Sequence, residues 1–218
     1  MAEDTSLDPM MAAIRAFTSR GYDATTVDDI ADAAEISRST FFRRFKSKDD
    51  VVFADHEILL RRVDEYLETT SAAPLQAVCG AARLVFEHHV KRKEISLARF
   101  TLLHNVASLR DRELITSHRY ERAFTHFLGA TLSDNSEREY LSVAFSAAVV
   151  ALHNAMLRKW LLEPEKPLLL KLDAQFKLLT KAFTGDAGTS DKEGYLVAVF
   201  DRDGAPDDLI EAIRSSLH

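Results

Sequence analysis

The chain has 218 residues, 46% of them hydrophobic and 28% charged, and its net charge at pH 7 is −6. This composition is typical of a soluble globular protein with a substantial core. The single Cys79 excludes an internal disulfide, and we find no uninterrupted apolar run near the ~18 residues of a membrane span. The N-terminus is acidic and unlike a signal peptide, so we expect a cytoplasmic protein without a membrane partner.

Three short helices are predicted in the first 45 residues. The first begins at Pro9 and stops at Gly21. The second begins at Thr26, whose side chain is spaced to form a capping box with Asp29, and Ser37 caps the third. About three residues join the second and third helices, which is typical of a helix-turn-helix.

The third helix carries most of a basic cluster. Residues 36–48 contain five basic residues and no acid, a local charge of +5 that leaves −11 for the rest of the chain: Arg38, Arg43, Arg44, Lys46 and Lys48. A recognition helix must present such a polar face to a major groove about 12 Å wide while its apolar face packs on the domain. Guanidinium groups suit guanine edges and phosphates, although spacing alone also fits a solvated surface.

The remaining pattern stays helical as far as residue 184. A longer helix follows the capping-box spacing of Ser47 and Asp50 and runs from about 48 to 69. Further helices are predicted at 75–92, 94–107, 109–130, 137–162 and 167–184. The helix at 137–162 has a stripe of small residues that lets another helix approach closely.

The end of the chain changes character. Residues 185–193 are polar and predict a linker, and residues 194–200 are rich in β-branched and aromatic side chains, as in a strand. An amphipathic helix is predicted after Pro206. We expect an ordered strand-helix appendage that docks on the helical body, with a disordered tail as the alternative.

Two stretches of the N-terminal region carry a family resemblance: residues 21–31 (GYDATTVDDIA) and residues 36–48 (ISRSTFFRRFKSK). They closely resemble the DNA-binding domain of the TetR (tetracycline-repressor) family. The resemblance covers about residues 9–55, and it implies a helical ligand-binding and dimerisation domain behind the DNA-binding one.

The resemblance also implies which side chains meet DNA. Thr26 resembles the helix-start threonine that meets a phosphate, and Lys48 resembles the lysine that touches the DNA backbone. The third helix would face the major groove. The implied DNA-binding residues are Thr26, Ser37, Arg38, Ser39, Thr40, Phe42, Arg43, Arg44 and Lys48.

This sequence departs from the family pattern at two places. Glu35 stands in the turn where the family usually has Gly, which would cost on the order of 1 kcal/mol if the position is left-handed. Phe42 replaces an aromatic residue with a phosphate-binding hydroxyl, so that hydrogen bond is lost. The neighbouring Arg44, often His in the family, could replace it electrostatically.

A ligand pocket is predicted among the central helices. Aromatic side chains there are mixed with His and Asn, which suits an apolar cavity with a few polar anchors, although most such residues belong to plain cores. The expected ligand-binding residues are Phe86, His89, Phe100, His104, Phe124, Phe127, Asn154 and Trp160, with His153 on the same helices. The Thr-Phe-Phe-Arg run with the following Ser-Lys-Asp-Asp-Val-Val also resembles family members associated with acyl-thioester-like or other lipid-like effectors.

Motifs of catalysis and metal binding are missing from the sequence. It has no nucleophile elbow, phosphate loop or dinucleotide fingerprint, and its histidines do not form a His-x-x-x-His pair. We therefore expect no enzymatic activity, no metal and no cofactor. Cys79 is expected to be a small core residue rather than a redox sensor.

The sequence therefore predicts an all-α protein in three parts. Residues 1–50 are a helix-turn-helix DNA-binding domain, residues 51–184 bind a ligand and dimerise, and residues 185–218 are the linker and appendage. We expect a homodimeric repressor that binds a palindromic operator in double-stranded DNA and is released by a small apolar or acyl-type effector. A helical enzyme, a module that binds only proteins, and an activator are the alternatives.

Overall fold

The computed structural model describes residues 9–132, 136–164 and 167–184, and side chains are not described for residues 136–139. The regular secondary structure within these ranges is helical. The chain divides into two units, Met1–Asp186 and Ala187–His218. The predicted linker and strand-helix appendage lie outside the described residues.

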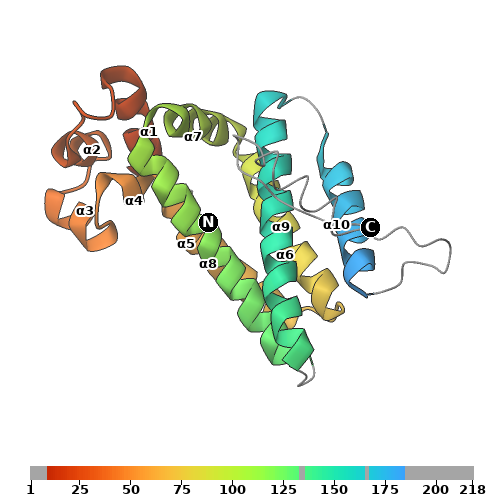
Figure 1. Ribbon diagram of the computed structural model, residues 1–218. Helices are drawn as coiled ribbons and strands as arrows, with labels where there is room; N and C mark the ends of the chain where they lie inside the picture. The colour runs from red at the N-terminus through yellow and green to blue at the C-terminus, as the bar shows by residue number, and fades with distance from the viewer. Residues whose placement is uncertain (1–8, 133–135, 165–166, 185–218) are drawn as a thin grey trace, which may run out of the picture. The chain divides into compact units, whose positions relative to one another are not determined.

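Four short helices form the N-terminal region, which we call the head (red and orange in Figure 1). They are α1 (Pro9–Arg20), α2 (Val27–Ala33), α3 (Arg38–Arg44) and α4 (Lys48–Val52). The helix-turn-helix predicted from the sequence is therefore present as α2 and α3.

Local capping explains where these helices start. Thr26 and Asp29 form the predicted capping box of α2, in which each side chain bonds the backbone N–H of the other residue. Ser37 and Ser47 cap α3 and α4 by accepting a hydrogen bond from the backbone three residues on. Glu35, in the turn between α2 and α3, is left-handed with φ of 54°.

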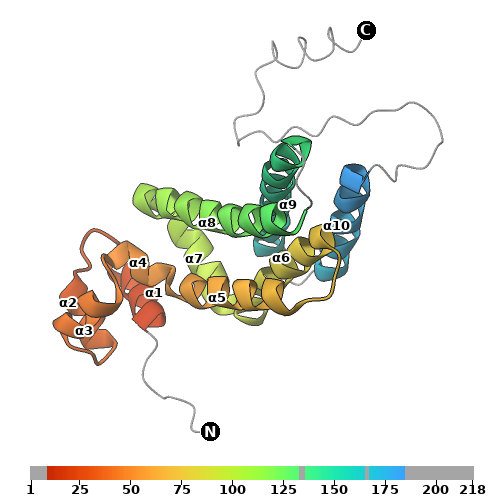
Figure 2. The same ribbon diagram turned by 90° about the horizontal axis from the view of Figure 1, so that it is seen from below.

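Six longer helices follow and form the body (Figures 1 and 2). They are α5 (Ala54–Thr69), α6 (Pro74–Lys91), α7 (Lys93–Asn105), α8 (Ala107–Thr131), α9 (Ser136–Leu162) and α10 (Leu169–Thr184). The predicted single helix at 48–69 is wrong. It breaks at Phe53, whose φ of −112° and ψ of 18° are not helical and whose side chain is buried.

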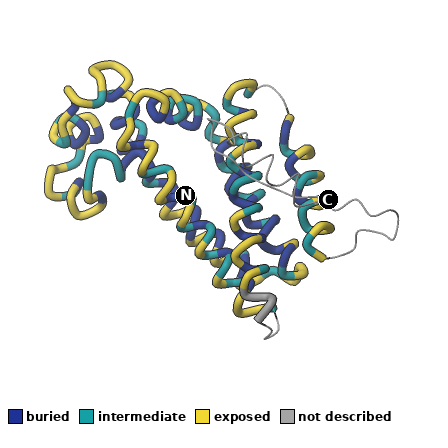
Figure 3. The backbone as a smooth tube through the Cα atoms, viewed as in Figure 1, coloured by how far each residue is buried: buried dark blue, intermediate teal, exposed yellow. Residues whose placement is uncertain are grey.

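Two apolar cores stabilise the described part of the first unit. Figure 3 shows the buried residues along the inner faces of the helices. The larger core lies in the body and contains Phe86, Phe124, Phe145 and Trp160. The smaller core fills the head and continues into α7 and the start of α8 through Ile95, Leu102, Leu103 and Leu109. The head therefore packs directly on the helices that carry the predicted ligand region.

Helix α9 corrects one expectation from the sequence. Tyr140–Leu162 is long and apolar enough to cross a membrane by length and composition, with a mean hydropathy of 1.6. No uninterrupted apolar run marks this helix in the sequence, because Ser142, Ser146, His153 and Asn154 are spread among its apolar residues. The helix packs against α6, α8 and α10, and 39% of its apolar window is buried.

Candidate functional site: a recognition helix and a polar cavity

Helix α3 turns one face inward and the other to solvent. Phe41 is fully buried and packs edge-on against Phe45, which anchors the helix in the head core. The side chains on the opposite side are exposed and form the recognition face: Arg38, Ser39, Phe42, Arg43 and Arg44. This is the division that a groove-reading helix requires.

The arginines of the recognition face differ in what they contact. The Arg38 guanidinium donates to both carboxylate oxygens of Asp28 at 2.6 Å and lies 5.2 Å from the ring centre of Phe42. Arg43 makes no ion pair within the described part of the chain. Arg43 is therefore the freer of the two to contact DNA.

Thr26 and Lys48 are already engaged inside the head. The Thr26 hydroxyl donates to Asp29 at 2.6 Å and accepts from its backbone N–H at 3.1 Å. The Lys48 ammonium donates to the backbone oxygens of Tyr22 at 2.7 Å and Thr25 at 3.2 Å, and it lies 4.0 Å from the Tyr22 ring centre. Lys48 thus fixes the loop before α2, and its contact with DNA stays a prediction.

Polar contacts tie the head to α8. Asp50 on α4 pairs with Arg112 on α8. The Tyr22 hydroxyl donates to Asp49 and accepts from Ser108 at 3.2 Å. Burial, with the Asp49 hydrogen bond, raises the pKa of Tyr22 to about 12, so the phenol stays protonated. A shift of α8 would therefore pull on both the loop before α2 and helix α4.

A cavity of about 80 Å³ lies among the helices of the body, with Phe53 at the α4–α5 break in its wall. Most of its accessible wall is apolar, although ten of the nineteen lining residues carry polar groups. The lining residues are Phe53, His56, Ala82, Val85, His89, Ser96, Arg99, Phe100, Leu103, Glu113, Thr116, Ser117, Tyr120, Phe124, Val150, His153, Asn154, Leu157 and Leu161.

The structure brings some of the predicted ligand residues together and not others. His89, Phe100, Phe124, His153 and Asn154 line the cavity. Four more do not: Phe86 and Trp160 are core residues that meet edge-on, Phe127 packs on the core, and His104 is exposed. The ligand role of all of them stays a prediction.

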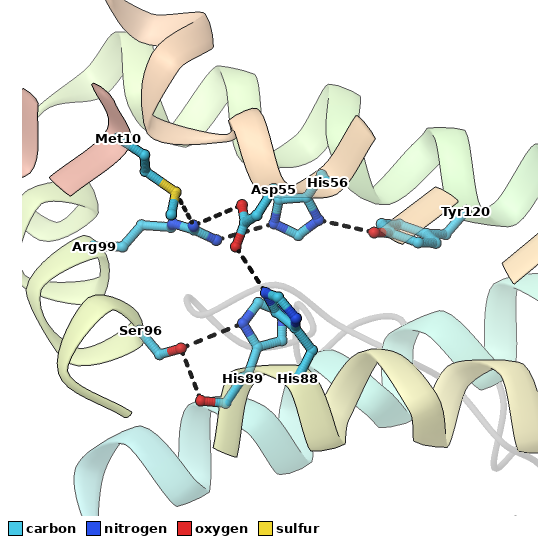
Figure 4. A network of polar contacts seen from close by, with 8 residues as sticks. All are labelled: Met10, Asp55, His56, His88, His89, Ser96, Arg99 and Tyr120. Carbon is cyan, nitrogen blue, oxygen red and sulfur yellow. Dashed lines mark hydrogen bonds and ion pairs between the residues drawn. The ribbon is translucent and has the colours of Figure 1, made fainter. Parts of the chain in front are cut away.

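A buried polar network crosses one wall of the cavity (Figure 4). Arg99 on α7 donates to Asp55 at 2.8 Å and to His56 Nε2 at 3.0 Å, both at the start of α5. His88 Nε2 bonds the other Asp55 oxygen at 3.1 Å, and His56 Nδ1 lies 2.9 Å from the Tyr120 hydroxyl. The network thus joins α5, α6, α7 and α8.

The same guanidinium reaches the head. Arg99 Nη2 lies 3.1 Å from the Met10 sulfur, on the first turn of α1 (Figure 4). Arg99 is therefore a side chain of the cavity wall that also touches the head.

Burial and pairing set the charges of this network. Burial alone would raise the pKa of Asp55, but the Arg99 charge and the His88 hydrogen bond hold it far below its usual range. Burial lowers the pKa of His56 to about 3 and of His153 to about 4, and it holds that of His89 well below 6.5. At neutral pH the Asp55–Arg99 ion pair thus lies near the neutral imidazoles of His56, His89 and His153.

Sequence reasoning missed Asp55, His56, Arg99 and Tyr120. One signal was present for Arg99. It follows Ile95 by four residues and precedes Leu102 by three, so a charge occupies the apolar register of α7. A charge in that position predicts a buried ion pair, but not its partner. Within the described ranges, no group of three or more His, Cys, Asp or Glu is placed to hold a metal ion.

Two family models match the chain and together cover most of its length. Residues 10–54 match the bacterial regulatory proteins of the tetR family, and residues 72–184 match the MftR C-terminal domain. The first match contains the helix-turn-helix, and the second spans α6 to α10.

Individual proteins match this chain in sequence over a smaller part of its length than they match it in fold. The HTH-type transcriptional regulator TcmR of Streptomyces glaucescens is 40% identical over 75 residues, which are 34% of this chain and 33% of TcmR. The match thus spans about a third of that relative's length.

Two solved structures share the fold at low sequence identity. FadR of Bacillus subtilis, solved in complex with stearoyl-CoA, has a TM-score of 0.56 and 15% identity, covering 79% of this chain and 96% of that chain. FadR of Thermus thermophilus, in complex with lauroyl-CoA, has a TM-score of 0.53 and 21% identity, covering 88% and 98%.

Proposed function

The chain belongs to the TetR family of bacterial transcriptional regulators, and from this premise we propose that it is a cytoplasmic homodimeric repressor. Residues 1–50 would bind a palindromic operator, and residues 51–184 would dimerise and hold a small, largely apolar effector. Binding of the effector would release the DNA.

One observation carries the proposed response to a ligand. The Arg99 side chain lines the cavity and also contacts Met10 in α1. Phe53, at the break between α4 and α5, lines the same cavity. An occupant that displaces either side chain would change how the head sits on the body. That change would alter the spacing of two recognition helices in a dimer and so shift the population that fits the operator.

The proposed dimer rests on apolar side chains that α9 and α10 leave exposed. Tyr140 and Val143 on α9 are 76% and 52% exposed, and Leu170 and Leu178 on α10 are 78% and 61% exposed. Ala144, Ala147 and Ala155 are exposed on α9 as well, so a partner helix could approach closely. A two-fold axis along these helices would place two recognition faces about one DNA turn, ~34–36 Å, apart.

The effector class rests on the cavity lining and on the similar structures. Phe53, Phe100, Phe124 and Val150 give the cavity apolar walls. The two FadR proteins that share this fold hold acyl-CoA thioesters in their structures. We therefore place acyl-type molecules first among the effectors to be tested.

The test starts from DNA. Genomic fragments that the full-length protein retains are sequenced to find its operator, and lauroyl-CoA, stearoyl-CoA and a metabolite library are then screened for release. Arg43→Ala should weaken operator binding, whereas Arg62→Ala, at an exposed arginine of α5, should leave it unchanged. Retention of no specific site, or binding by a monomer, would refute the proposal.

A further inference from the structure

An exposed ion pair joins the two helices of the helix-turn-helix. Arg38, the first residue of α3, donates from Nη1 to both carboxylate oxygens of Asp28 on α2 at 2.6 Å. The Arg38 side chain is 62% exposed and that of Asp28 is 57% exposed. An ion pair this open to water contributes little to folding, so stability does not explain an acid at this place.

An aromatic ring supports the same guanidinium from a second side. The central carbon of the Arg38 guanidinium lies 5.2 Å from the ring centre of Phe42, which is one turn further along α3. The Phe42 ring meets the buried Phe41 edge-on, with ring centres 5.6 Å apart. Arg38 is thus held by a carboxylate at one nitrogen and by a ring beside its plane.

The contact with Asp28 leaves most donors of Arg38 unused. A guanidinium has five N–H donors, and Nη1 supplies two of them. Nη2 and Nε keep the other three, and neither bonds another group in the described part of the chain. Guanine presents two acceptors, O6 and N7, at its edge in the major groove, and two guanidinium nitrogens match them. Arg38 can therefore read a guanine without leaving Asp28.

The charge of Asp28 opposes DNA binding in general. A carboxylate beside the recognition face repels phosphates whatever the base sequence. Specificity is a difference between affinities, so a contact that weakens binding to wrong sequences raises it. Asp28 also keeps Arg38 from turning toward a phosphate, and base edges are contacted by the N-terminal residues of a recognition helix, where Arg38 lies.

We propose that Arg38 reads a guanine in each operator half-site and that Asp28 is the positioning residue that fixes it for this base. Nη2 and Nε of Arg38 donate to guanine O6 and N7, while Nη1 stays on Asp28. Phe42 supports the guanidinium through its ring, a role that needs no hydroxyl group. This inference rests on the proposed function, since it assigns base specificity within the operator contact.

The first test locates the guanine. Each base pair of one half-site is replaced in turn, and binding of the full-length protein is measured by fluorescence anisotropy. One position should show a preference of about tenfold or more for G·C in the unaltered protein and none in Arg38→Ala. Arg38→Lys keeps the charge but not the planar fork, so it should lose the same preference while binding more tightly than Arg38→Ala. A preference that survives in Arg38→Lys would overturn the guanine contact.

The second test separates positioning from charge. Asp28→Asn and Asp32→Asn each remove one exposed acid of α2, but Asp32 makes no ion pair within the described residues. Both variants should bind scrambled DNA about two- to threefold more tightly at low salt. Only Asp28→Asn should reduce the preference for the G·C pair, from about tenfold to threefold or less. The same preference in both variants would refute the positioning role of Asp28.

The outcomes distinguish this inference from the proposed function. If the protein retains no specific DNA, the proposed function fails and the inference fails with it. If it binds a specific operator in which no guanine depends on Arg38, the inference alone is refuted. All the substituted residues are exposed, so the variants should fold, and circular dichroism checks this.

Discussion

The recognition face and the cavity both depend on arginines, but the two settings give those arginines opposite properties. Arg43 on α3 is exposed and makes no ion pair within the described residues. Arg99 on α7 is buried and contacts Asp55, His56 and Met10. A surface charge contributes little to folding and remains available to a partner, whereas a buried charge must be paired. Substitutions at the two sites should therefore fail in different ways.

The largest expected effect is on stability, at the buried pair. Asp55→Ala leaves the Arg99 charge without its carboxylate inside the protein, and such a change costs about 3–5 kcal/mol. Unfolding in urea, followed by circular dichroism, measures the loss. The double variant Asp55→Ala/Arg99→Met should recover much of it, because no unpaired charge is then buried. A loss below about 1 kcal/mol in the single variant would show that Arg99 finds solvent or another partner.

Acid should weaken the body through its buried histidines. Their pKa values in the fold, about 3 for His56 and about 4 for His153, lie below 6.5, so below pH 6.5 the unfolded chain takes up protons that the folded chain refuses. The free energy of unfolding should thus fall as the pH decreases from about 6.5 to about 4, by up to about 1.4 kcal/mol per pH unit for each of these residues.

Urea unfolding at a series of pH values measures this slope. His153→Gln should reduce it by about one residue's share, and His126→Gln, at an exposed position of α8, should leave it unchanged. An unchanged slope in His153→Gln would mean that His153 takes up its proton at the same pH in the folded protein as in the unfolded chain.

The head could be predicted from sequence in more detail than the cavity, because its helices are set by local signals. Thr26 with Asp29, Ser37 and Ser47 each act within three residues of chain, and all cap helices where the sequence places them. The break at Phe53 has no such signal, since neither Gly nor Pro is near it. Tertiary packing of this buried side chain sets it.

The cavity depends on contacts between distant residues. Arg99 and Asp55 are 44 positions apart, and His56 and Tyr120 are 64 apart. Helical periodicity predicts which residues turn inward, and it placed His89, Phe100, Phe124 and Asn154 in the region that lines the cavity. It does not predict which residues an inward side chain will contact. Phe86 and Trp160 also turn inward, but they pack in the core of the body and do not line the cavity.

An intermediate effect is expected on DNA binding, at the recognition face. Arg43→Ala should cost about 1–3 kcal/mol of binding to the operator if its guanidinium reads a guanine, with little change in thermal stability. Lys48→Ala should instead weaken binding to all sequences similarly, because the loop before α2 loses its anchor at Tyr22 and Thr25. Fluorescence anisotropy with operator and scrambled DNA measures both. Equal losses on the two DNAs in Arg43→Ala would show that Arg43 contacts only the backbone.

The smallest effect is expected at Glu35, in the turn of the helix-turn-helix. Its φ of 54° costs a non-glycine residue about 1 kcal/mol, and its side chain is exposed, so little packing is lost on removing it. Glu35→Gly relieves this strain but makes the unfolded chain more flexible. We therefore expect a gain of about 0.5 kcal/mol in the free energy of unfolding.

Glu35→Gln keeps the strain and removes only the charge. It should leave stability nearly unchanged while strengthening non-specific DNA binding at low salt, because one acid fewer lies beside the recognition face. Equal stability of the two variants would mean that the left-handed turn is not strained.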